Sequence, residues 1–231
     1  MKHKLIPLLV LAISCATSSC TAIKYRSPWL DRVAQVHTQV AVLPFEVILV
    51  GKLPARLTPA QVAEIERHES LTFQTALYYE LLDRSDSRRK QPIRVHLQPV
   101  EATNRLLSDN GVSLWQSWSM PAEELAGLLG VDAVVRTRVE KARYLSNAAS
   151  FAIDAGHHVL DDVSDGRYGW LVPHGLTRTH DIFADASLLN GADGDLLWKV
   201  AVSRATDWQQ PPNDVVFGIT RKLAKKFPYR G

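Results

Sequence analysis

The stretch that most restricts the fold of this chain is residues 40–48, which read VAVLPFEVI. Nearly all of these side chains are apolar and several are β-branched, which is typical of a strand covered on both faces. Such a strand belongs in a sheet that has helices packed against it. Pro44 has no N–H to donate to a neighbouring strand, so it predicts a bulge or a position near an edge.

A long helix is predicted after this strand. Thr58 is a good N-cap, Pro59 suits the first helical position and Gln61 completes a capping box. Apolar residues then recur at helical spacing to about Leu82. Further helices are predicted at 101–107, at 121–129 before Gly130, and from the N-cap Asn213 to Pro228.

Strands are predicted between these helices, at 93–100 and from 131 towards 144. Near the end of the chain, apolar runs at 183–189 and 196–202 flank a loop rich in Asn, Gly and Asp, a pattern that predicts a hairpin. Residues 147–180 show no clear period and stay unassigned.

This order of elements predicts an α/β (α+β) fold. We expect a mixed β-sheet of about five strands with helices packed on it, in a single main domain. The chain has 231 residues, of which 46% are hydrophobic. A chain of this size buries about 70% of its unfolded surface, so its core needs no cofactor for stability.

The amino terminus has the features of a secretory signal. A basic start is followed by an apolar run at 5–13, much shorter than a membrane-spanning helix, and then by small residues around Cys15 and Cys20. The arrangement resembles a bacterial lipoprotein signal, in which the cysteine after the cleavage site carries lipid. Cys20 leaves the more usual spacer and is the expected lipid attachment site. Cys15 and a plain cleaved signal remain alternatives.

The expected division of the chain is therefore a lipoprotein signal peptide at 1–19, a tether at 20–37, and an α/β envelope domain at 38–231 with an insertion at about 147–180. Removing 1–19 takes Lys2 and Lys4 and no acidic residue, which leaves 25 basic against 24 acidic residues. A nearly neutral body argues against nucleic acid as a partner, because binding to phosphates needs a concentrated basic surface.

The body lacks the sequence motifs of common enzymes. It contains no P-loop, no Gly-x-Gly-x-x-Gly, no Gly-x-Ser-x-Gly and no His-Glu-x-x-His, and it has no cysteine for thiol catalysis. We therefore predict no catalytic residue and no cofactor, and expect that the protein is not an enzyme.

One group of residues would suit a metal ion if it were brought together. On a helix, His158 and Asp162 would lie four positions apart on one face. Histidines on the surface among turn aspartates are the simpler interpretation, so no metal site is predicted. The full group comprises Asp154, His157, His158, Asp161 and Asp162, with His174 and His180 nearby in the sequence.

Four other features have a structural interpretation that we prefer to a functional one. The loop 190–195 lacks the distant glutamate of an EF-hand calcium site. Trp115 and Trp118 would form a ridge for sugars or a partner, but aromatic residues more often pack in a core. Basic residues on the last helix fit a solvated face better than lipid contact, and the polar connector 85–90 fits a loop better than a phosphate site. The basic residues of the last helix are Arg221, Lys222, Lys225 and Lys226.

Three stretches together resemble a known family. They are VAVLPF at 40–45, ELAGLLGVDAVV at 124–135, and DASLL at 185–189 followed by LLW at 196–198. The chain looks like cell-envelope lipoproteins that share the α/β domain of the curli-secretion lipoprotein (CsgG-like), which is similar to the amino-terminal domain of the Tol-system propeller protein. The family often has a glycine in the strand after the Val-Val pair, whereas this chain has RTR there, at 136–138. The resemblance implies a fold and a location, and no catalytic residues.

The leading hypothesis is a lipid-anchored, non-enzymatic adaptor or assembly module on the periplasmic side of a membrane, with an envelope protein as partner. If Cys20 carries the lipid, the residue after it is Thr21 and not an aspartate. By what is known of such lipoproteins, this is compatible with sorting to the outer membrane. One alternative is an oligomeric pore or secretion subunit that uses 147–180. Another is a metal-dependent enzyme built on the group at 154–162. The oligomeric state is left open.

Overall fold

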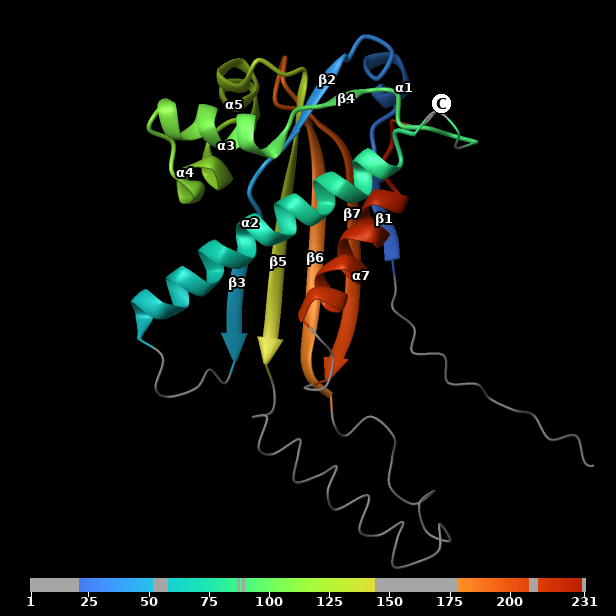
Figure 1. Cartoon of the computed structure of the whole chain (residues 1–231). Helices are drawn as coiled ribbons and strands as arrows, with labels where there is room; N and C mark the ends of the chain where they lie inside the picture. The colour runs from blue at the N-terminus through green and yellow to red at the C-terminus, as the bar shows by residue number, and fades with distance from the viewer. Residues whose placement is uncertain are drawn as a thin grey trace, which may run out of the picture.

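The computed structural model describes residues 21–51, 58–86, 88, 90–143, 178–207 and 212–229. Its centre is one mixed sheet of seven strands in the order β1-β7-β6-β5-β2-β4, with β3 also paired to β5 (Figure 1). The strands are β1 Thr21–Arg26, β2 Gln39–Val42, β3 Glu46–Gly51, β4 His96–Leu97, β5 Ala133–Arg143, β6 Arg178–Asn190 and β7 Leu196–Asp207. The predicted α/β fold is confirmed, with seven strands in place of about five.

Helices pack on this sheet. They are α1 Leu30–Val33, α2 Pro59–Asp83, α3 Val100–Asp109, α4 Leu114–Ser119, α5 Ala122–Leu129 and α7 Pro212–Lys225. The long helix α2 and the last helix α7 run side by side over one face of the sheet, and α3, α4 and α5 lie together at one end of the molecule (Figure 1).

The stretch at 40–48 forms two strands that both pair in parallel with β5. Val42 lies opposite Val135, and Glu46 lies opposite Arg138. Four residue steps lead from Val42 to Glu46, but only three lead from Val135 to Arg138 on β5. One extra residue is therefore accommodated around Pro44. This is the predicted bulge. The carbonyl of Val42 accepts a hydrogen bond of 2.8 Å from the side chain of Gln74 on α2.

The start of α2 has the predicted cap. The backbone N–H of Gln61 donates to the Thr58 hydroxyl, and the backbone N–H of Thr58 donates to the side chain of Gln61. Apolar side chains of α2 and α7 then form one core with the sheet. Its members include Phe73, Leu77 and Leu81 from α2, Ile219 and Leu223 from α7, and Val135, Val139, Leu188, Trp198 and Val200 from the strands.

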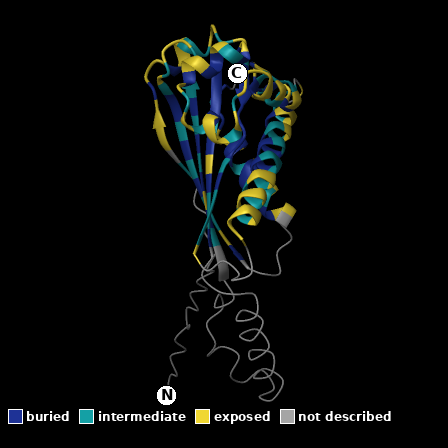
Figure 2. Cartoon of the chain, turned by 90° about the vertical axis from the view of Figure 1, so that its left-hand side faces the viewer, coloured by how far each residue is buried: buried dark blue, intermediate teal, exposed yellow. Residues whose placement is uncertain are grey.

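A smaller core forms on the opposite face of the sheet. Leu125 and Leu129 of α5 pack there against Leu43 and Val134. Figure 2 shows that buried residues concentrate in the half of the sheet flanked by helices, while more exposed residues appear along the outer elements. The sheet is therefore covered on both faces at one end, as the apolar run at 40–48 predicts.

Strands β6 and β7 form the predicted hairpin, and its turn contains Gly194 with a φ of 74°. The Nδ2 group of Asn190 donates to Asp193 Oδ1 at 2.8 Å, and the backbone N–H of Asp195 donates to the same oxygen at 3.0 Å. These side chains hold the turn together, which agrees with the hairpin interpretation of the loop.

Two segments differ from the sequence prediction. The expected tether at 20–37 contains β1, which is antiparallel to β7, and α1, whose Leu30 is 1% exposed in the core. The reason is that β7 has a free edge with which 21–26 pairs. The predicted strand 93–100 is reduced to β4, because the chain turns at Pro99 and Val100 begins α3.

Helix α4 was not predicted. It has its own capping box, in which Ser113 accepts from the backbone N–H of Gln116 and the Gln116 side chain accepts from that of Ser113. Within the part of the chain that the structure describes, no helix is both long and apolar enough to span a membrane.

Candidate functional site

A groove with a volume of about 450 Å³ lies between α2 and α7. It is open to solvent on the face of the molecule where both helices lie. Its walls come from one stretch of α2 and the following turn and from the middle of α7. The lining residues are Tyr79, Glu80, Asp83, Arg84, Phe217 and Arg221.

Helical spacing explains why these residues reach the groove. On α2, Leu77 and Leu81 point into the core, so Glu80, three positions after Leu77, lies at the border of the buried face. On α7, Ile219 is buried, and Phe217 two positions earlier is turned outward. The groove therefore forms where the two helices diverge above their shared core.

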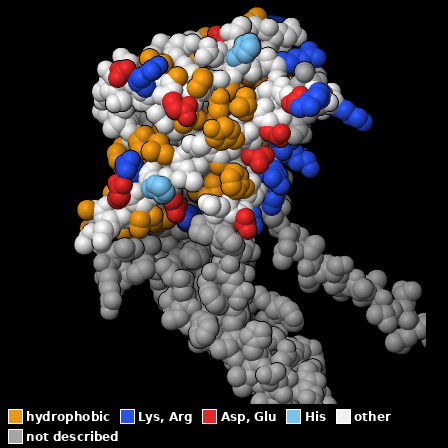
Figure 3. Space-filling view, viewed as in Figure 1, with side chains coloured by type: hydrophobic (Ala, Val, Ile, Leu, Met, Phe, Trp, Pro, Cys, Tyr) orange, Lys and Arg blue, Asp and Glu red, His pale blue; other side chains and the backbone are white. Residues whose placement is uncertain are grey.

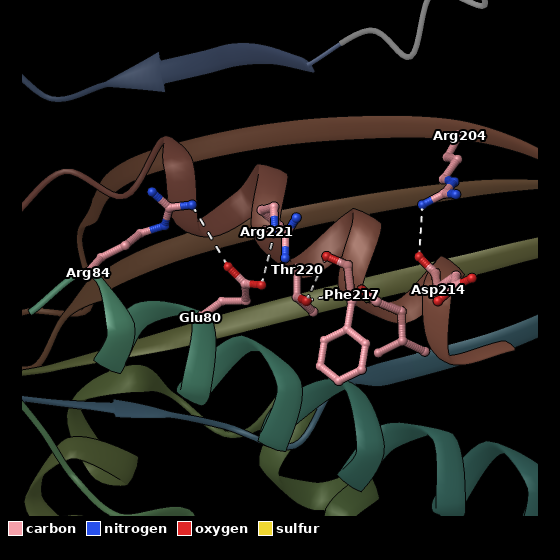
Figure 4. Close-up of polar contacts among 8 residues, drawn as sticks. Glu80, Arg84, Arg204, Asp214, Phe217, Thr220 and Arg221 are labelled. Carbon is pink, nitrogen blue, oxygen red and sulfur yellow. Dashed lines mark hydrogen bonds and ion pairs between the residues drawn. The ribbon is translucent and has the colours of Figure 1, made fainter. Parts of the chain in front are cut away.

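Its floor contains a carboxylate between two guanidinium groups. Glu80 Oε2 lies 3.8 Å from a terminal nitrogen of Arg84 in the turn after α2, and Glu80 Oε1 lies 3.3 Å from Nε of Arg221 on α7. Figure 4 shows the Glu80 side chain directed between these two arginines. The turn after α2 and the helix α7 thus each contribute one cation to the same acid, and this contact fixes the floor of the groove.

Arg84 is the more buried of the two cations. Its side chain is 17% exposed, compared with 70% for Arg221. The buried Nε–H of Arg84 finds no acceptor among the described residues. The 3.8 Å contact between a terminal nitrogen of Arg84 and Glu80 is longer than a hydrogen bond. The Arg84 guanidinium therefore keeps donor capacity that this part of the chain does not use.

Two aromatic side chains flank this floor. Tyr79 is 57% exposed and Phe217 is 48% exposed, although both have large apolar rings. Figure 3 shows hydrophobic side chains gathered in patches over the face that carries α2 and α7, with acidic and basic groups between them. An exposed aromatic pair beside buried charge is typical of a surface that binds another protein.

The other end of α7 is held by the sheet. Arg204 of β7 donates a hydrogen bond of 3.0 Å to the carbonyl oxygen of Asp214 in the first turn of α7 (Figure 4). The helix is thereby fixed to the sheet near its start as well as through its buried face. The Phe217 side of the groove is therefore carried by a rigid element, which lowers the entropy lost when a partner binds.

A second polar cluster joins distant parts of the chain. The carboxylate of Asp132 accepts hydrogen bonds from the backbone N–H groups of Thr38 and Gln39 and from the Thr38 hydroxyl, at 2.6, 2.9 and 2.8 Å. Burial would raise the pKa of Asp132, but these hydrogen bonds outweigh it and hold the pKa below its ordinary value. The aspartate of the Gly-Val-Asp-Ala-Val-Val stretch therefore ties β5 to the start of β2.

The sequence candidates for metal binding are not brought together in the part of the chain that the structure describes. Six of the seven lie outside the described residues: Asp154, His157, His158, Asp161, Asp162 and His174. His180 lies in β6. Among the described residues, no group of three or more His, Cys, Asp or Glu side chains is placed to hold a metal ion.

The tryptophan pair has two different environments. Trp118 donates from Nε1 to the carbonyl oxygen of Pro44 at 3.0 Å, so it packs over the bulge. Trp115 stacks edge-on against it at a centroid distance of 4.6 Å and is 49% exposed. The packing interpretation is correct for Trp118, while Trp115 lies on the surface.

The sequence analysis did not identify the groove. The sequence feature that could have indicated an exposed apolar surface here is a pair of doublets, YY at 78–79 and LL at 81–82. Neighbouring helix positions point about 100° apart, so two adjacent large apolar residues cannot both lie on a narrow buried face. Tyr79 and Leu82 are indeed exposed, at 57% and 44%.

Comparisons with known proteins agree on a general likeness only. No protein-family model matches the chain, and no curated protein matches it. Among solved structures, it is similar to the PelC dodecamer from Paraburkholderia phytofirmans, with 12% identity, a TM-score of 0.40, and coverage of 88% of this chain and 94% of that one.

Two other similar structures are lipoproteins or their domains. Lipoprotein GNA1162 from Neisseria meningitidis has 13% identity and a TM-score of 0.38, with coverage of 83% of this chain and 99% of that one. The LpoB C-terminal domain from Salmonella enterica has 11% identity and a TM-score of 0.32, with coverage of 78% and 93%. Scores this low carry no argument about function, and the narrower CsgG-like resemblance stays a prediction.

Proposed function

We propose that this protein is a lipid-anchored, non-enzymatic adaptor of the bacterial cell envelope that binds a protein partner in the groove between α2 and α7. The observation that carries the proposal is the exposed pair Tyr79 and Phe217 beside the buried charges of the groove. Anchoring through Cys20 and the outer-membrane location rest on the amino-terminal signal, and the CsgG-like resemblance belongs to the same proposal.

The groove favours a particular kind of partner segment. The aromatic walls suit an apolar side chain, since rings at an interface contribute large contact area at low entropic cost. The guanidinium groups of Arg84 and Arg221, which both line the groove, suit a carboxylate, since a guanidinium binds one through paired hydrogen bonds. The expected occupant is therefore a peptide segment of an envelope protein with an acidic residue next to an apolar one.

In-cell crosslinking tests this proposal. A photo-reactive phenylalanine analogue would replace Phe217, and in a matched control it would replace Trp115, which is equally exposed but lies on α4. We expect one discrete crosslinked envelope protein from position 217 that position 115 does not capture. A second strain combines the probe at 217 with Arg84→Gln, which should reduce that crosslink at least about tenfold, because a charge-assisted contact is lost.

Two results would count against the groove. One is the same captured protein from both probe positions, which indicates collision rather than docking. The other is a crosslink at 217 that Arg84→Gln leaves at full yield, since the charged floor would then have no part in recognition.

A further inference from the structure

A second surface combines aromatic and basic side chains, and it lies on β1 and α1. Tyr25 is 42% exposed and Trp29 is 59% exposed, which makes them two of the larger apolar side chains on the surface. Lys24, Arg26 and Arg32 are exposed between and beside them. We call residues 24–32 the β1–α1 margin.

The margin is rigid. Leu30, immediately after Trp29, is 1% exposed in the main core and fixes α1 against the sheet. The Trp29 backbone N–H donates to the hydroxyl of Ser27 at 3.2 Å, and the Arg32 guanidinium lies 5.0 Å from the centre of the Trp29 ring. Trp29 is thus held facing outward, beside a cation.

The margin also lies close to the proposed anchor. Thr21 already pairs with Val202 of β7, so the sheet begins one residue after Cys20. Consecutive Cα atoms are about 3.8 Å apart, so a lipid on Cys20 holds the start of this edge strand at the membrane surface. A long tether would have let the domain move away from the bilayer, and the pairing of β1 removes that freedom.

The charge of this side of the molecule fits an anionic surface. Within 24–32 there are three basic residues and one acid, Asp31, which is paired with Arg26. Tryptophan and tyrosine favour the boundary between lipid and water, and each basic residue near an anionic membrane adds electrostatic attraction.

The geometry points to the β1–α1 margin as the surface that lies on anionic lipid headgroups, with Trp29 and Tyr25 at the boundary and Lys24 and Arg32 against the lipid phosphates. This inference rests on the proposed anchoring at Cys20. In this orientation the edge of the sheet that carries β1 faces the membrane.

Fluorescence quenching by brominated lipids tests the orientation. The full lipidated chain is reconstituted in vesicles of brominated phosphatidylcholine with phosphatidylglycerol and recovered by flotation. The chain has six tryptophans. Trp29→Phe should remove most of the quenchable emission, whereas the matched variant Trp115→Phe, which alters an exposed tryptophan on α4, should leave the quenched fraction unchanged.

A second variant tests the charge. Lys24→Gln combined with Arg32→Gln should lower the quenching of Trp29 by at least about twofold in vesicles with phosphatidylglycerol, because two of the three cations of the margin are removed. Flotation with equal quenching in the wild type and Trp29→Phe overturns the orientation while the anchor stands. A chain that does not float at all overturns the anchoring, and the orientation with it.

Discussion

The imidazole of His37 lies 2.5 Å from the hydroxyl of Tyr229, across 192 positions of the chain. The other ring nitrogen lies 3.2 Å from Oδ1 of Asn190 in the β6–β7 hairpin. Asn190 Oδ1 only accepts hydrogen bonds, so Nε2 of His37 carries the proton and Nδ1 accepts from Tyr229. One neutral histidine thus joins the start of β2, the hairpin and the end of the chain.

This arrangement predicts that stability falls in mild acid. Burial lowers the pKa of His37 below its ordinary value of 6.5, against the opposing effects of Asp132, Asn190 and Asp193. A histidine with a lowered pKa binds its proton more readily when unfolded. Its contribution is therefore complete above pH 6.5 and is lost as the pH falls through 6.5 towards the lower folded value.

Urea unfolding at pH 7.5 and pH 5.5 measures this effect, with His37→Gln as the comparison. The wild type should lose more free energy of unfolding between the two pH values than His37→Gln does. Asp132 does not interfere, because its pKa lies below an already low ordinary value. Identical losses in the two proteins would show that His37 does not titrate differently on folding.

Gln74 should be among the most sensitive polar residues of α2. It is fully buried, it donates to the carbonyl oxygen of Val42 next to the bulge, and it exchanges two amide hydrogen bonds of 3.0 Å with Asn104 of α3. Gln74→Leu leaves these groups without partners, so we expect a loss of about 2–3 kcal/mol in the free energy of unfolding. Thr72→Ala, at a partly exposed position of the same helix, should change stability by less than about 1 kcal/mol. Equal effects of the two changes in urea unfolding would refute this role of Gln74.

Gly191 is required for close packing beneath the hairpin. A Cβ there would lie 2.6 Å from Cβ of Ala126 and 2.7 Å from the carbonyl oxygen of Asp132. Gly191→Ala should therefore lower the melting temperature and cost about 1–3 kcal/mol. Gly127→Ala on α5 meets nothing within 4 Å and should be neutral or stabilising by up to about 1 kcal/mol. The prediction fails if calorimetry finds Gly191→Ala as stable as the wild type.

Local signals in the sequence predicted much of the fold. The Thr58 capping box, the left-handed Gly130 at the end of α5 and the Asn-Gly turn each specify a boundary through a few neighbouring residues, and all three are present. The bulge at Pro44 is a local effect as well. In each case the residues that cause the structural feature lie within a few positions of it along the chain.

Features that depend on distant partners could not be predicted. Strand β1 exists because β7 offers an edge 179 positions later, as in the pairing of Ala22 with Ala201, while its own sequence has no clear alternation. The groove depends on α2 and α7 lying side by side, which no local pattern specifies. Only the structure shows that Phe217 and Tyr79 line the same groove.

The mass of the mature amino-terminal peptide decides whether the proposed adaptor is held on a membrane through Cys20. The protein would be purified from membranes of cells fed labelled palmitate and digested. If Cys20 is the lipid attachment site, the peptide begins at Cys20 and carries the label, and the Cys20→Ala variant incorporates no label. An unmodified peptide, or a label retained in Cys20→Ala and lost in Cys15→Ala, would contradict it.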